Sequence, residues 1–148
     1  NVVVMRTFSK IQGLAGLRIG YGLAPSGLAS VLQKTRQPFN ANHLAQEAAL
    51  AALADEEHQF ETKRITDNGR QFLQQSFDKM GLEYIPSYAN FVLVKVGDGD
   101  AVFDALLRKG VIVRAMRGYK LPEWVRISVG RKEENQRCVE LLKEVVLG

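Results

Sequence analysis

The stretch that decides the fold is residues 7–21, which spell TFSKIQGLAGLRIGY. Two hydroxyl side chains and an amine, those of Thr7, Ser9 and Lys10, follow a β-branched run that predicts a strand over residues 2–6. A glycine-rich turn then separates Lys10 from the guanidinium of Arg18. Such a set suits a ligand with a reactive aldehyde and a phosphate, because an amine can form a Schiff base while hydroxyls and an arginine hold the phosphate.

Spacing alone leaves a simpler interpretation open, in which Lys10 and Arg18 are solvated surface charges. Three glycines, Gly13, Gly16 and Gly20, punctuate the segment. Their spacing matches neither the dinucleotide-binding fingerprint nor a P-loop. The residues therefore indicate an anion site near an amine without selecting one ligand.

The composition is that of an ordinary folded domain. The 148 residues are 46% hydrophobic, and 13 glycines and four prolines are too few for a collagen-like or disordered chain. Apolar runs fall far short of the ~20 residues that a membrane-spanning helix needs, so no membrane partner is expected. The chain opens with NVVVM, as though a strand were already under way, so we expect a piece of a longer protein.

Charge and cysteine content exclude several classes of protein. The net charge is +4, and the basic residues are scattered rather than clustered, so we expect no nucleic-acid partner. One cysteine excludes an internal disulfide framework and fits a reducing, cytoplasmic compartment. Cys138 has helical spacing with Leu141 and Val145, which predicts burial in a core. His43 and His58 have no ligand spacing, so no metal site is expected.

Apolar periodicity and turn residues predict an α/β chain. Helices are predicted over residues 28–36, 44–54, 56–80, 100–109 and 133–146. Further strands are predicted within residues 17–23 and over residues 84–85, 91–96, 111–114 and 124–129. Strands alternate with helices after residue 81, which predicts a compact α+β unit there. The first part of the chain, up to residue 40, is typical of the end of a different α/β sheet.

Residues 7–21 resemble the Schiff-base lysine segment of fold-type I pyridoxal-phosphate aminotransferases, in particular the histidinol-phosphate aminotransferase branch. The resemblance continues in order over nearly the whole chain, through PFNAN (38–42), ANF (89–91), GVIVR (110–114) and VRISVG (125–130). It implies the carboxy-terminal portion of such an enzyme. The implied organisation is the end of the large cofactor-binding domain at 1–40, bridging helices at 41–80 and a small α+β domain at 81–148.

The resemblance implies a role for six residues. Lys10 would be the catalytic residue that holds pyridoxal 5'-phosphate and shuttles a proton, and Thr7, Ser9 and Arg18 would bind the phosphate of the cofactor. Arg126 and Arg114 would bind the anionic group of the substrate, a carboxylate or a phosphate, because a guanidinium forks onto either.

The implied activity is transfer of an amino group between a phosphorylated amine or amino acid, most simply histidinol phosphate, and 2-oxoglutarate, in a homodimer. Groups that members of the family carry before the lysine have no counterpart in these residues, so the piece alone is expected to be inactive. Three alternatives stay open. One is a related enzyme of the same fold, a threonine-phosphate decarboxylase or a broad or aromatic aminotransferase; the others are a non-catalytic anion-binding module and a structural or dimerisation fragment.

Overall fold

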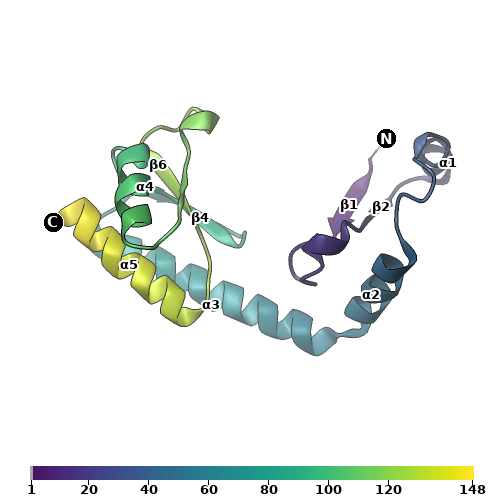
Figure 1. Cartoon of the computed structure of the whole chain (residues 1–148), viewed down its shortest axis with the longest axis horizontal. Helices are drawn as coiled ribbons and strands as arrows, with labels where there is room; N and C mark the ends of the chain where they lie inside the picture. Colours follow the sequence, from purple (N-terminus) through teal and green to yellow (C-terminus); the bar gives the residue numbers. More distant parts are fainter. Residues whose placement is uncertain (1) are drawn as a thin grey trace. The chain divides into compact units, whose positions relative to one another are not determined.

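The computed structural model describes residues 2–148, which form two compact units, one up to Lys63 and the other Arg64–Gly148 (Figure 1). The boundary between the units falls inside one long helix, α3 (Glu56–Met80). Among the described residues, no helix is both long and apolar enough to cross a membrane.

The first unit is built on a β-hairpin. Strands β1 (Val4–Thr7) and β2 (Gly20–Leu23) pair in antiparallel fashion, and Thr7 lies opposite Gly20. A side chain on Gly20 would place its Cβ 2.7 Å from the carbonyl oxygen of Arg6, so this register requires glycine. The loop between the strands contains a short 3-10 helix, Ala15–Leu17. Residues 7–21 therefore form one closed structural element.

Two helices follow the hairpin, α1 (Ser26–Thr35) and α2 (His43–Ala54). The side chain of Asn42 caps α2 by accepting a hydrogen bond of 2.8 Å from the backbone N–H of Ala45. Helix α2 is apolar nearly all round, and it buries Ala45 and Ala49 while Leu44 and Leu50 stay exposed. Helices with this pattern are typical of protein interiors.

The second unit has a four-stranded antiparallel sheet in the order β3–β4–β6–β5. Its elements after α3 are β3 (Tyr84–Ile85), β4 (Phe91–Lys95), α4 (Gly99–Arg108), β5 (Arg114–Ala115), β6 (Trp124–Ser128) and α5 (Lys132–Leu147). Helix α3 ends at Met80 because Gly81 follows with a φ of +67°, a conformation that glycine adopts without strain.

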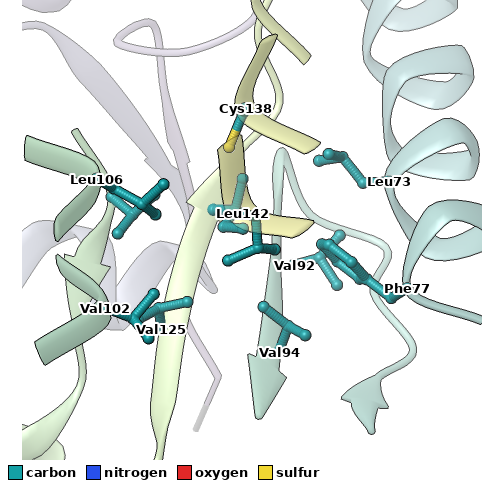
Figure 2. Close-up of a cluster of buried hydrophobic side chains, with 11 residues drawn as sticks. Leu73, Phe77, Val92, Val94, Val102, Leu106, Val125, Cys138 and Leu142 are labelled. Carbon is teal, nitrogen blue, oxygen red and sulfur yellow. The ribbon is translucent and has the colours of Figure 1, made fainter. Parts of the chain in front are cut away.

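The core of this unit lies between one face of the sheet and its helices. Strands β4 and β6 pair side by side in the centre of the sheet. Alternate residues of each strand are buried, so the same face of both strands points inward. Figure 2 shows the inward side chains, which come from the strands and from α3, α4 and α5 and point toward one another; they include Leu73, Phe77, Val92, Val94, Val102, Leu106, Val125, Cys138 and Leu142. The burial predicted for Cys138 is confirmed.

The strand predicted over residues 111–114 is wrong in its position. The strand in this region is β5, Arg114–Ala115. The backbone N–H of Val111 donates to the carbonyl of Leu106 at 2.9 Å, so it completes the end of α4 instead of a sheet. Val113 is buried in the core. Together with Val111 and Ile112 it forms a β-branched run, which is typical of a strand.

Candidate functional site

The hairpin loop gathers the hydroxyls and the guanidinium that the sequence predicted. The backbone N–H of Ser9 donates to Thr7 Oγ1 at 3.0 Å. A guanidinium nitrogen of Arg18 donates to the carbonyl of Ala15 at 2.6 Å and reaches Ser9 Oγ at 3.5 Å, the outer limit of a hydrogen bond. These contacts link Thr7, Ser9 and Arg18 into one polar cluster, which we call the hydroxyl–arginine cluster.

The backbone conformation of Arg18 helps to form this cluster. Its φ is +53°, in the left-handed region that non-glycine residues rarely adopt. This geometry turns the chain sharply after the 3-10 helix and directs the guanidinium back over the loop toward Ser9. Backbone strain of this kind gathers at binding sites, where surrounding contacts hold it in place.

Lys10 follows Ser9 directly and lies exposed on a loop that is tied at several points. The N–H of Gly13 donates to the carbonyl of Lys10 at 2.9 Å, and the N–H of Leu14 donates to the carbonyl of Phe8 at 2.8 Å. Phe8 anchors the loop, since it is only 4% exposed and its ring lies 5.8 Å from that of Tyr21. The backbone of Lys10 is therefore held in place directly after Ser9 of the hydroxyl–arginine cluster.

An open pocket of about 610 Å³ borders the hairpin. Its lining includes Gly20, which pairs with Thr7, and residues of the segment 38–41. Phe39 in that segment is 97% exposed at a positive φ of 56°. The volume lies within the range of pockets that hold small molecules.

The second unit places Arg114 and Arg126 directly opposite each other. Arg114 on β5 pairs with Arg126 on β6, and antiparallel partners carry their side chains on the same face of a sheet. That face is the one away from the core, because the neighbours of Arg126 on β6, Val125 and Ile127, point inward. Like charges in opposite positions repel each other, so the arrangement favours an anion between the two guanidinium groups.

Each arginine of this pair stacks on an aromatic ring. The guanidinium of Arg126 lies 5.0 Å from the ring centre of Phe91, and that of Arg114 lies 5.4 Å from the ring centre of Tyr119. Within residues 2–148, Arg126 Nε is buried and has no hydrogen-bond partner. Stacking restrains a guanidinium without using its N–H groups.

Sequence reasoning gave no role to Phe91 or Tyr119. Phe91 belongs to the ANF motif (89–91), and it lies on β4 two residues from Leu93, the partner of Arg126. That relation depends on strand register, which the sequence does not give. The hydroxyl–arginine cluster and Lys10 lie in the first unit and the arginine pair in the second, and each set is assembled within its own unit.

The chain is similar to known proteins over nearly its whole length. A family model described as aminotransferase class I and II matches residues 1–142. Over 146 residues the chain is 60% identical to a histidinol-phosphate aminotransferase of Akkermansia muciniphila, and the match covers 99% of the chain and 40% of that relative. The chain thus spans well under half the length of this relative.

Two solved structures show the same fold. The histidinol-phosphate aminotransferase of Sinorhizobium meliloti, in complex with pyridoxal-5'-phosphate, matches 99% of the chain and 41% of its own chain at 36% identity and a TM-score of 0.88. The L-threonine-O-3-phosphate decarboxylase of Porphyromonas gingivalis matches at 24% identity, with a TM-score of 0.85, over all of this chain and 47% of its own. This second likeness concerns the fold alone.

Proposed function

The chain belongs to the aminotransferase class I and II family, and from this premise we propose that it is the carboxy-terminal part of a pyridoxal-phosphate-dependent aminotransferase. The proposed reaction moves the amino group of histidinol phosphate to 2-oxoglutarate in a ping-pong sequence. The observation that carries the proposal is the hydroxyl–arginine cluster directly beside Lys10.

The donors of this cluster suit the phosphate of the cofactor. Thr7 Oγ1 and Ser9 Oγ each accept a hydrogen bond in the structure, and each hydroxyl keeps its own proton to donate to a phosphate oxygen. The guanidinium of Arg18 adds a charge-assisted donor. Gly13 and Gly16 have no atom within 4 Å of where a side chain would begin, so the backbone of the loop is open to a ligand. The residues present therefore fit pyridoxal phosphate.

Bound pyridoxal phosphate supplies an aldehyde that takes up the substrate amine and a ring that stabilises negative charge on the substrate Cα. Lys10 would hold the aldehyde of the cofactor in the resting enzyme, and its Nζ would serve as a base once the substrate amine occupies that position. Lys10 Nζ removes the proton from the substrate Cα and delivers a proton to C4′ of the cofactor. The tied loop holds the Lys10 backbone in place while its side chain moves the proton.

Arg114 and Arg126 are proposed to bind the anionic end of the substrate. Their opposed positions and the unpartnered Nε of Arg126 support this role. Histidinol phosphate offers a phosphate and 2-oxoglutarate offers carboxylates, and the planar fork of a guanidinium accepts both. One arginine pair can thus serve both halves of the reaction.

The related decarboxylase activity is the second candidate, because a threonine-phosphate decarboxylase shares the fold. It also binds a phosphorylated substrate, so an arginine pair suits it equally. The 60% identity to the histidinol-phosphate aminotransferase of Akkermansia muciniphila favours the amino-transfer reaction. A non-catalytic anion-binding module gives no role to Lys10, the residue directly after Ser9 of the hydroxyl–arginine cluster.

We extend the proposal to organisation and partners. Residues 1–40 would close the large domain, residues 41–80 would bridge, and residues 81–148 would form the small domain of a cytoplasmic homodimer. The exposed leucines of α2 support burial of that helix by further protein in the intact enzyme. Because the chain covers 40% of its relative, we expect residues 1–148 alone to show no turnover.

The test uses the full-length protein with histidinol phosphate and 2-oxoglutarate, and it measures glutamate and carbon dioxide in the same reaction. We expect glutamate without carbon dioxide, and a Lys10→Ala loss of at least about 10²-fold in kcat, because general acid–base catalysis contributes that much. Lys34→Ala, in the last turn of α1, is the matched control and should keep full activity. Carbon dioxide without glutamate would establish the decarboxylase instead.

A further inference from the structure

A histidine from the start of α3 holds the loop that carries Lys10. His58 Nε2 lies 3.1 Å from the carbonyl oxygen of Ile11, the residue directly after Lys10 and 47 positions away from the histidine in the chain. A carbonyl oxygen only accepts hydrogen bonds, so Nε2 must carry the proton and donate it. The contact lies within the first unit.

We infer that His58 is a positioning residue for Lys10, because its Nε2–H fixes the backbone of the lysine loop against the first turn of α3. The role of Lys10 in this inference rests on the proposed function. His58 does not touch the reacting atoms and would act only through the loop.

The loop needs this contact because its own hydrogen bonds hold other carbonyls. The two bonds that close the turn are accepted by the carbonyls of Phe8 and Lys10. The carbonyl of Ile11 is instead held by a side chain from outside the loop. The bond therefore restrains the peptide between Ile11 and Gln12, the second peptide after Lys10, and through it the backbone of the turn that carries the lysine.

The backbone of His58 is held at the junction of α2 and α3. The backbone N–H of His58 donates to Asp55 Oδ1 at 2.9 Å, which caps the start of the helix. The next residue, Gln59, donates from its side chain to the carbonyl of Ala52 at 3.0 Å and so ties α3 to the end of α2. His58 thus lies at a capped helix start, and displacements of about 1 Å at a catalytic group can cost about 10²-fold in rate.

The experiment uses the full-length protein and three variants. His58→Ala removes the donor, His58→Gln keeps an amide N–H at about the reach of Nε2, and His43→Ala removes the other histidine. His43 is a matched control because it is exposed in the first turn of α2, near Glu47. Amide hydrogen exchange is measured on the protein freed of cofactor, over peptides that cover residues 8–14.

In His58→Ala we expect exchange in residues 8–14 to speed up by about two- to tenfold, the equivalent of one hydrogen bond lost near the surface. In the cofactor-loaded enzyme, kcat should fall by a similar factor while KM for the amino donor stays within about twofold, since the substrate-binding arginines are untouched. His58→Gln should restore both readouts, and His43→Ala should match the parent protein in both.

Unchanged exchange in His58→Ala would overturn the inference, whatever the activity of the enzyme. Failure of His58→Gln to restore slow exchange would also overturn it, because the effect would then not depend on a donated hydrogen bond. Failure of the proposed function gives a different result. In that case the loop would loosen in His58→Ala, but Lys10→Ala would keep activity, and the link from His58 to catalysis would be rejected together with the role of Lys10.

Discussion

Three features of Arg126 suit this residue to binding an anion. Its guanidinium stacks on Phe91, its Nε is buried without a partner within residues 2–148, and a second arginine lies directly opposite. Loss of a charge-assisted pair costs about 1.5–3 kcal/mol, or roughly 10- to 150-fold in affinity. We predict that Arg126→Ala raises KM for the phosphorylated donor by that factor, as measured by steady-state kinetics on the full-length enzyme.

Arg126→Lys should fall between the parent and Arg126→Ala, because lysine keeps the charge and loses the fork. Arg108→Ala removes an equal charge from the last turn of α4 and serves as the control. If Arg126→Ala and Arg108→Ala give the same KM, the role of the arginine pair is disproved.

Cys138 gives a prediction about pH. Burial raises the pKa of its thiol from 9.0 to about 11. In the unfolded chain the thiol loses its proton at lower pH than in the folded protein, so the stabilisation is complete below pH 9 and is lost as the pH rises through 11. The free energy of unfolding should therefore fall between pH 9 and 11, with a slope of at most about 1.4 kcal/mol per pH unit from this group.

Denaturant unfolding of the parent and of Cys138→Ala over this pH range isolates the thiol, because lysine and tyrosine titrations are common to both proteins. The difference in stability between the two proteins should shrink as the pH rises. A constant difference would show that the thiol is not desolvated. Low thiolate content at neutral pH also makes Cys138 unsuitable as a nucleophile.

At the scale of elements, helix α3 depends on Gly69. A Cβ at this position would lie 2.5 Å from Val129 Cγ1 and 2.7 Å from Asn135 Nδ2, so the glycine allows α3 to approach the start of α5. We predict that Gly69→Ala lowers the free energy of unfolding by about 1–3 kcal/mol through overpacking, although alanine favours helices by about 1 kcal/mol. Thermal or urea unfolding measures the change.

Gly27→Ala in α1 is the matched control, since no atom lies within 4 Å of the new Cβ. Here only helix propensity acts, and we expect a gain of up to about 1 kcal/mol. A Gly69→Ala protein that is as stable as Gly27→Ala would show that α3 and α5 can separate without cost.

The same helix shows how much of the fold the sequence predicts. Its bounds, Glu56–Met80, agree with the prediction because acidic residues begin it and Gly81 ends it, and both signals are local. The strand over 111–114 was wrong because the end of α4 and the core compete for those residues, and that competition depends on tertiary contacts. Local signals therefore locate the helices better than the short edge strand.

At the scale of the whole molecule, some groupings in the candidate site follow from the sequence and others do not. Thr7, Ser9 and Lys10 are neighbours in the chain, so their motif already places them together. The opposed positions of Arg114 and Arg126 come from the register of β5 and β6. The contact between His58 and Ile11 likewise joins residues that no spacing relates. Contacts between distant segments could be found only from the structure.

The measurement that tests the central claim most directly is borohydride reduction of the full-length, cofactor-loaded enzyme, followed by peptide mapping. Reduction fixes the bond between the cofactor and its lysine. We predict one labelled peptide, with the cofactor on Lys10 beside the hydroxyl–arginine cluster. A label on any other lysine, or a loaded enzyme that takes no label, would contradict the account.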